Sequence, residues 1–277
     1  LRHNIKRSLL GLAIATILTA VFLGPLSSLF FLLGFGVLGV GLGFLARRSS
    51  SGVEVMLLGI LVSLGSKLLL MVIAAKVTGI NPFHLDGAEM QGMIDKIFGF
   101  YESAGMSGES MGKVKEQFSQ AMTVIPLIFP AILSVAAALD CYLSYRVSDL
   151  VMKRLGGASM PPLPSFANWR FPKSVFGALL ASFLLLLFPG AEGDWSLPQR
   201  IGLNVRMLVN ILFLLQGLSL FWHFLGRGEG AGRRTGRILR PAVIIAAVFI
   251  PALSTFTVMA GIADMWLDFR TRFRRND

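Results

Sequence analysis

The chain has 277 residues, of which 54% are hydrophobic and only 15% are charged. Soluble domains carry about 25% charged residues, so this composition excludes an ordinary soluble domain and indicates helices that face lipid. The net charge is +11, but the basic residues cluster at the edges of apolar runs, as they do in loops beside membrane spans. No basic face with interleaved aromatic residues is visible, so the sequence does not favour a nucleic-acid partner.

The sequence gives no support to metal or catalytic chemistry. Cys141 is the only cysteine, which excludes an intrachain disulfide and a metal site built from several cysteines. The three histidines are far apart, and no HExxH-type spacing occurs. We therefore expect no metal, no cofactor and no catalytic residue, and a non-enzymatic protein is favoured over an enzyme.

Apolar runs along the chain predict membrane spans, because a spanning helix needs about 20 mostly apolar residues. Pro251 interrupts the last of these runs, which is either one bent helix or two short ones. The sequence thus predicts an all-α polytopic transmembrane bundle of seven spans, or eight, in a single membrane domain over residues 1–277. The predicted spans are Ser8–Gly24, Leu26–Ala46, Val53–Ala75, Met122–Leu143, Ser174–Pro189, Ile201–Leu225 and Ile238–Ala263.

Charged loops predict the orientation of these spans. Basic residues fill alternate loops, at Arg47 and Arg48, within Arg146–Lys173 and within Arg227–Arg237, and the loops between them are poor in Lys and Arg. The basic loops and the N-terminus are therefore expected on the cytoplasmic side of a bacterial cytoplasmic (inner) membrane. Seven spans would leave the C-terminus outside, whereas the arginines within Arg270–Arg275 favour the inside. The span count and the side of the C-terminus stay open.

The loop over residues 78–121 is predicted to be external and helical. Apolar residues recur at helical spacing around Met93 and Ile97, and again around Val114 and Phe118. Two amphipathic helices joined by a Gly/Ser turn at Ser103–Ser110 are therefore expected. They either cap the bundle or lie on the outer leaflet, or they form a lid over an outward-facing cavity.

Two stretches carry a family resemblance. Residues Arg146–Pro172 read RVSDLVMKRLGGASMPPLPSFANWRFP, with a basic helix end, a cytoplasmic Pro-rich linker over residues 153–173 and a Phe-x-x-Trp-Arg-x-Pro pattern. The closing segment Gly261–Arg272 reads GIADMWLDFRTR. Both stretches and the order of the apolar runs resemble the YybS-like family of bacterial membrane proteins. No catalytic residue transfers from this resemblance.

The turn at Pro25 followed by a glycine-rich helix is similar to the layout of S components, the substrate-binding subunits of energy-coupling-factor transporters. This second resemblance implies ATPase or coupling subunits as partners. The chain has no ATPase motif of its own, and the glycine-rich loop Gly226–Arg237 lacks the Lys-Ser/Thr of a phosphate-binding loop. We expect that loop to lie near anionic lipid. Gly39 and Gly43 form a GxxxG pattern, which predicts close helix packing.

Polar side chains inside a bilayer are costly, so each one is a candidate for function. Lys67 lies near the middle of the third span, and Ser63 shares its helical face. Asp140 and Asp264 are candidate ion-pair partners. Lys67 is either a solute-binding residue, a member of a structural pair, or a lysine that extends its side chain to the interface.

The sixth span and the linker carry the other candidate residues. Arg206 and Asn210 are four residues apart. Together with Lys67 and Ser63, they are candidates to line a cavity in the outer half of the bundle. The alternatives are a side chain that extends to the membrane interface for Arg206 and an interhelical hydrogen bond for Asn210. Trp169 and Arg170, between Pro164 and Pro172, are expected to anchor at the membrane interface or to dock a cytoplasmic partner.

Three functions follow from these residues. The first is an S-component-like binder or importer of a small anionic solute, which contacts the lipid bilayer and partner subunits. The second is a non-enzymatic scaffold or regulator that recruits a cytoplasmic regulatory partner. The third is an intramembrane enzyme that acts on lipid through Asp140 or Asp264.

Overall fold

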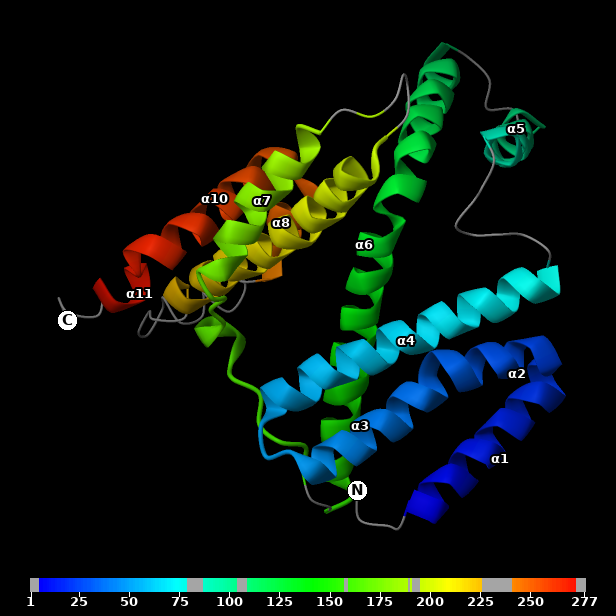
Figure 1. The fold of residues 1–277 in the computed structure, drawn as a ribbon. Helices are drawn as coiled ribbons and strands as arrows, with labels where there is room; N and C mark the ends of the chain where they lie inside the picture. The colour runs from blue at the N-terminus through cyan, green and yellow to red at the C-terminus, as the bar shows by residue number, and fades with distance from the viewer. Residues whose placement is uncertain are drawn as a thin grey trace. The chain divides into compact units, whose positions relative to one another are not determined.

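The computed structural model describes residues 5–78, 87–103, 109–156, 159–188, 190, 195–225 and 241–272, and every element in these residues is helical. The chain divides into two compact units, Leu1–Leu163 and Pro164–Asp277, which are described separately (Figure 1). The boundary falls within the predicted linker. That the two units form a single membrane domain stays a prediction.

The first unit contains a helical hairpin that turns at Gly24 and two long helices, α4 and α6. Gly24 has a φ of 90°, which favours glycine, and Pro25 follows it at the first position of a new helix. This turn folds α1 back on the next span, which runs through α2, a π-helical segment η1, and α3. The elements of this unit are α1 (Ile5–Leu23), α2 (Pro25–Phe31), η1 (Leu32–Gly36), α3 (Val37–Arg48), α4 (Gly52–Thr78), α5 (Gly87–Ser103) and α6 (Glu109–Arg154).

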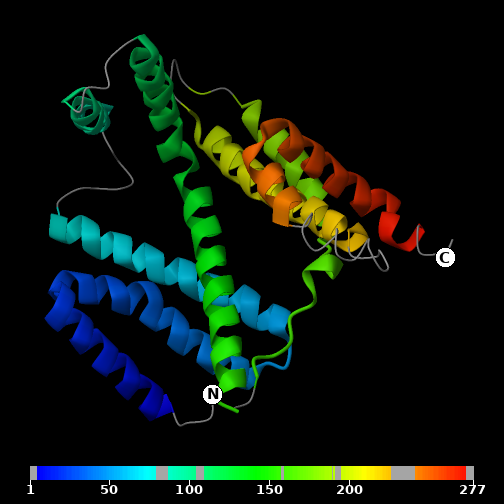
Figure 2. The ribbon, with the colours of Figure 1, turned by 180° about the vertical axis from the view of Figure 1, so that it is seen from behind.

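The core of the first unit lies where α3 and α4 run side by side and α6 crosses them, as both ribbon views show (Figures 1 and 2). Gly59 permits this contact, because a Cβ there would overlap Leu42 and Cys141. Tyr145 donates a hydrogen bond to the carbonyl of Pro161, which fixes the chain after α6 against the helices. The buried core residues are Leu38, Leu42, Val55, Cys141, Tyr145 and Met160.

The second unit packs its helices around α8. Ser196 caps α8 in a capping box with Gln199, which satisfies two backbone N–H groups at the start of the helix. Gly217 on α8 and Gly261 on α10 allow the two backbones to approach closely, because a Cβ on either glycine would overlap the opposite main chain. The elements are η2 (Phe166–Asn168), α7 (Ser174–Leu186), α8 (Leu197–Phe224), a helix over Pro241–Phe249, α10 (Pro251–Leu267) and α11 (Phe269–Arg272).

Four helices of the described residues are long and apolar enough to cross a membrane. The pair Pro241–Phe249 and Pro251–Leu267 is bent by 108° and makes a fifth if it is one broken span. The first and fifth predicted spans correspond to the shorter apolar helices Ser8–Leu23 and Ser174–Leu186. The prediction of an all-helical membrane protein is therefore confirmed. The predicted number of seven or eight spans stays a prediction. The four spans are Pro25–Arg48, Gly52–Val77, Val124–Arg154 and Leu197–Phe224.

The predicted external loop differs from the structure at its second helix. This helix is not separate: α6 is one helix of 46 residues that runs through Pro126 and Pro130 into the span. Membrane helices tolerate such prolines. The α5 helix packs on α6 through Ile94 and Phe98, whose ring lies 5.9 Å from that of Phe118. The predicted turn between the helices lies mostly outside the described residues.

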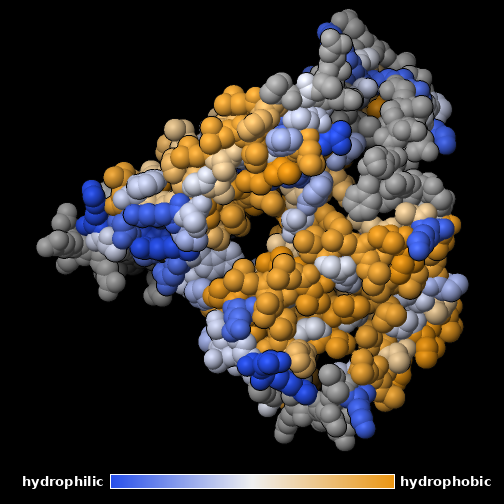
Figure 3. Space-filling model, in the orientation of Figure 1, coloured by the Kyte–Doolittle hydropathy of each residue, from blue (hydrophilic) through white to orange (hydrophobic). Residues whose placement is uncertain are grey.

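Large apolar side chains cover much of the outer surface of the described helices. Figure 3 shows hydrophobic residues over the visible faces of both units, with hydrophilic residues gathered near the helix ends. On α1 alone, Val21, Phe22 and Leu23 are each at least 70% exposed. Such surfaces are stable only against lipid or another protein, which agrees with the composition.

Candidate functional site

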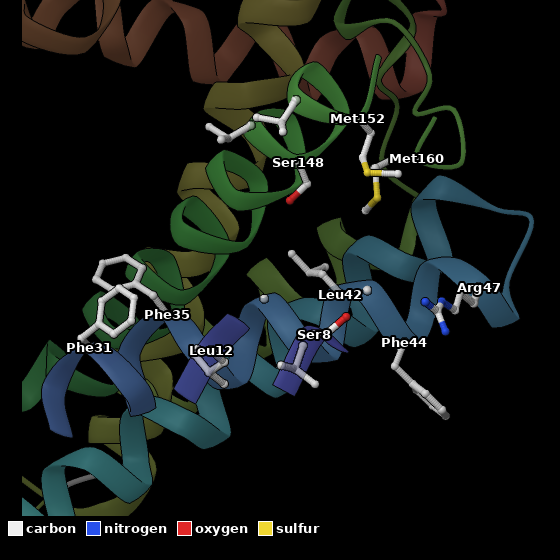
Figure 4. Close-up of a pocket in the computed structure, with 16 residues that line it drawn as sticks. Ser8, Leu12, Phe31, Phe35, Leu42, Phe44, Arg47, Ser148, Met152 and Met160 are labelled. Atoms are coloured by element: carbon white, nitrogen blue, oxygen red, sulfur yellow. The ribbon is translucent and has the colours of Figure 1, made fainter. Parts of the chain in front are cut away.

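A pocket of about 460 Å³ opens along α3 in the first unit. Its walls come from α1, the span formed by α2, η1 and α3, the end of α6, and Met160 in the linker (Figure 4). Phe31 and Phe35 lie at one end of the pocket, and Arg47 and Met160 lie at the other (Figure 4). Most of the lining is apolar, and the polar side chains among the lining residues are those of Ser8, Arg47 and Ser148.

Glycines form one wall of this pocket. Gly36, Gly39 and Gly43 all line it, and a Cβ built on Gly39 or Gly43 would meet no atom within 4 Å. The GxxxG pattern was predicted for close helix packing, but these two glycines do not touch another helix at that surface. Their missing side chains instead leave the space beside α3 open.

The π-helical segment η1 contributes Phe35 and Gly36 to one end of the pocket. A π-helical turn leaves backbone carbonyls without their usual helical donors, and such turns are frequent at functional sites. Ser66, buried on α4, donates a hydrogen bond to the carbonyl of Leu33 within η1. This contact holds the segment that carries Phe35 and Gly36 into the pocket lining.

The linker fixes the other end of the pocket. The backbone N–H of Met160 donates to Asp149 at 3.3 Å. A Cβ on Gly52 would lie 2.7 Å from the carbonyl oxygen of Pro161, so glycine at this position lets the linker pass over the start of α4. These contacts place Met160 against the core and in the lining.

Lys67, Ser63 and Asp140 come together between α4 and α6. Lys67 Nζ lies 2.5 Å from Asp140 Oδ2 and donates to Ser63 Oγ at 3.3 Å. The Lys67 side chain is 13% exposed and that of Asp140 is 32% exposed. Lys67 is thus held by a carboxylate and a hydroxyl, and it is not among the residues that line the pocket.

The other predicted site residues lie in the second unit. Arg206 and Asn210 are both exposed on α8, and the Arg206 guanidinium lies 4.8 Å from the centre of the Phe183 ring. Asp264 pairs with Arg270, whose Nε lies 3.2 Å from Asp264 Oδ2, and both side chains are almost fully buried. Trp169 donates to the carbonyl of Pro164.

A polar clamp holds the linker segment Phe166–Phe171 on α8. Gln216 accepts the backbone N–H of Phe171 at 3.2 Å, and Ser219 donates to the carbonyl of Phe166 at 2.6 Å. Arg270 donates to the carbonyl of Ala167 at 2.6 Å. The two stretches that carry the family resemblance therefore meet in space, and each satisfies buried polar groups of the other.

A second ion pair lies at the edge of this clamp, where Arg170 Nη2 is 2.8 Å from Asp268 Oδ1. Burial alone would raise the pKa of Asp268, but a hydrogen bond from Thr271 and the charge of Arg170 outweigh it, so this pKa lies below its usual 3.8. Burial lowers the pKa of Arg270, and the charge of Asp264 opposes that shift.

Sequence reasoning missed the pocket and most of the clamp. The sequence marks Arg47 only as a signal of topology and gives no signal for Ser148, because an i, i+3 or i+4 pattern does not reveal which helix faces which. Gln216 and Ser219 are three residues apart within an apolar run, and this helical spacing of two polar residues is the signal that could have located the docked segment. The described residues hold no group of three or more His, Cys, Asp or Glu that could bind a metal ion.

A family model described as "Predicted membrane protein (DUF2232)" matches residues 1–265 of the chain. No curated protein and no solved structure matches.

Proposed function

Because the chain belongs to the DUF2232 family of predicted membrane proteins, we propose that it is a non-enzymatic multi-pass protein that binds a small solute in the pocket along α3. The observation that carries this proposal is the pocket itself. Its volume of about 460 Å³ lies in the range of about 300–1,000 Å³ that small-molecule sites occupy.

The residues that form the pocket walls support a binding site and not a packing defect between helices. Gly39 and Gly43 leave space that any larger side chain would fill. At one end Ser66 donates a hydrogen bond to the backbone carbonyl of Leu33, and at the other end the backbone N–H of Met160 donates to the Asp149 carboxylate. A pocket whose walls are fixed before the ligand arrives loses little entropy on binding.

The same proposal includes the finer family assignments. A YybS-like protein that works as an S-component-like binder or importer would take its energy from ATPase or coupling subunits. The anionic preference then rests on Arg47, in place of Lys67, because Arg47 lines the pocket and Lys67 does not. Arg206 and Asn210 are exposed on α8, and we assign them to contact with lipid or a partner subunit.

The proposed orientation has the N-terminus in the cytoplasm of a bacterial inner membrane. Seven or eight spans require that both shorter apolar helices also cross the bilayer. Reporter fusions after Gly156 and Gly230 should then read cytoplasmic, and a fusion after Ser107 should read external. An external signal at Gly156 would contradict this orientation.

A scaffold or regulator is the second candidate, and the clamp is the observation that favours it. The clamp holds Trp169, Arg170 and Pro172 in one defined conformation, and both Arg170 and Pro172 are exposed. A rigid, exposed surface of this kind suits a cytoplasmic partner. The third candidate, an enzyme that acts on lipid, gains no support, because Asp140 and Asp264 are both held in ion pairs.

Native mass spectrometry of the protein purified in mild detergent tests the binding proposal. We expect a small molecule to stay bound to the wild type and to be lost from Gly39→Leu, whose side chain fills the pocket. Gly11→Leu is the matched control, since Gly11 has open space around it and does not line the pocket. A bound molecule retained equally by both variants would contradict the proposal.

A further inference from the structure

We infer that the pocket along α3 takes one acyl chain that ends in an anionic headgroup, with the chain along the glycine wall and the headgroup at Arg47. This inference rests on the proposed binding function and names its ligand class.

The length of the pocket is the first observation. Its lining runs along one helix from Gly36 to Arg47, which is roughly 17 Å at 1.5 Å per residue. The hydrocarbon core of a bilayer is about 30 Å thick, so one acyl chain reaches about half of that. The pocket is therefore about as long as a single chain in one leaflet.

The chemistry of the walls is the second observation. Between the two ends, most of the lining is apolar side chains and glycine surface, from residues such as Leu12, Val40 and Val151, and Ser8 and Ser148 add two hydroxyl groups (Figure 4). Two hydroxyl groups replace only part of the hydration of a sugar, nucleotide or amino acid, so such a polar solute would lose hydrogen bonds on entering. A saturated chain loses nothing on entering, because it needs no hydrogen bonds.

The single charge is the third observation. Arg47 lies in the last turn of α3, and Figure 4 places it at the end opposite Phe31 and Phe35. The polar side chains of Ser8 and Ser148 also line the pocket. The protein thus has a cation at the end of its membrane span, and arginine pairs well with carboxylate or phosphate. A neutral or cationic headgroup would gain no such contact.

Titrations of the purified wild type with defined amphiphiles test the ligand class. We expect hexadecanoate to raise the thermal midpoint, while hexadecanol and hexadecyltrimethylammonium should have much weaker effects. Shortening the carboxylate should weaken binding roughly fourfold per methylene. Equal stabilisation by hexadecanol would overturn the anionic assignment while leaving the pocket as a binding site.

Arg47→Gln tests the headgroup contact, and the neighbouring Arg48→Gln is its control, because Arg48 does not line the pocket. Loss of a charge-assisted hydrogen bond should weaken hexadecanoate binding roughly tenfold or more in Arg47→Gln, with little change in hexadecanol binding. An unchanged affinity in Arg47→Gln would overturn the inference, as would an equal loss in Arg48→Gln.

Failure of the inference is distinct from failure of the binding function. If Gly39→Leu keeps full hexadecanoate binding, the amphiphile binds elsewhere and the inference fails. If the wild type instead retains a polar solute that Gly39→Leu loses, the binding function stands and only the ligand class fails. The mass of a retained amphiphile separates a free carboxylate from an anionic phospholipid with one chain in the pocket, and either result supports the class.

Discussion

Arg270 and Asp264 form an ion pair in which Arg270 Nε lies 3.2 Å from Asp264 Oδ2, and neither side chain exposes more than 3% of its surface. The same guanidinium donates to the carbonyl of Ala167, more than a hundred residues earlier in the chain. This pair joins the C-terminal segment to the linker that begins the second unit. Arg270 therefore connects the two stretches that carry the family resemblance.

Arg270→Met should destabilise the second unit strongly. The change leaves Asp264 buried without its cation and the carbonyl of Ala167 without its donor, and breaking a buried pair costs about 3–5 kcal/mol. Thermal unfolding in detergent measures the loss, and proteolysis within Phe166–Phe171 should become faster. Arg272→Met is the control, because Arg272 is exposed. Equal effects of the two changes would contradict the role of the clamp.

Lys67→Met should lower stability by about 3 kcal/mol, at the lower end of the range for a buried pair because Asp140 is partly exposed. The double change Lys67→Met with Asp140→Leu should recover most of the loss, since it removes both charges together. A double-mutant cycle in thermal unfolding measures this coupling. Additive losses from the two single changes would mean that the pair contributes little.

Glycines in two places should respond oppositely to alanine. Gly39→Ala should be neutral or stabilising by about 0.5–1 kcal/mol, because alanine favours a helix and the added methyl meets open space. Gly217→Ala should destabilise by about 1–3 kcal/mol, because its methyl group overlaps the main chain of α10. Paired thermal unfolding curves check the contrast, and a loss at Gly39 as large as that at Gly217 would contradict the open wall.

Acid should weaken the second unit through Asp268. Its pKa is lower in the folded protein than the usual 3.8, because Thr271 and Arg170 outweigh the effect of burial. The stabilisation from the ionised carboxylate is therefore complete above the unfolded pKa and is lost as the pH falls through the lowered folded value. Asp268→Asn should be less stable near neutral pH and less sensitive to acid in this window. A wild type and a variant with parallel pH profiles would refute this assignment.

Much of the fold could be predicted from the sequence, because apolar runs and helix breakers are local signals. The turn at Gly24 and Pro25, the α4 helix and the interruption at Pro251 all follow from such signals. The predicted span Met122–Leu143 already includes Pro126 and Pro130, but the sequence does not predict that the preceding loop helix continues into this span to form α6.

The candidate site was less predictable, because it depends on which helix faces meet. Lys67 and Asp140 stood out because ionisable residues in a span are rare, and the structure places them 2.5 Å apart. The partner of Asp264 was not foreseen, since Arg270 was interpreted only as a charged end of the chain. The pocket was missed for a different reason: Gly39 and Gly43 form a pattern that in most membrane helices means contact, and here it borders open space.

Cysteine labelling at position 39 tests the central claim, that the pocket along α3 holds a ligand, most directly. The single native cysteine, Cys141, is buried, so the wild type should react slowly with a small maleimide. Gly39→Cys should react quickly, and saturating hexadecanoate should protect it, while Gly11→Cys on α1 should react equally with and without hexadecanoate. If Gly39→Cys is labelled at the same rate with and without the amphiphile, hexadecanoate does not occupy the pocket and the account of this site is contradicted.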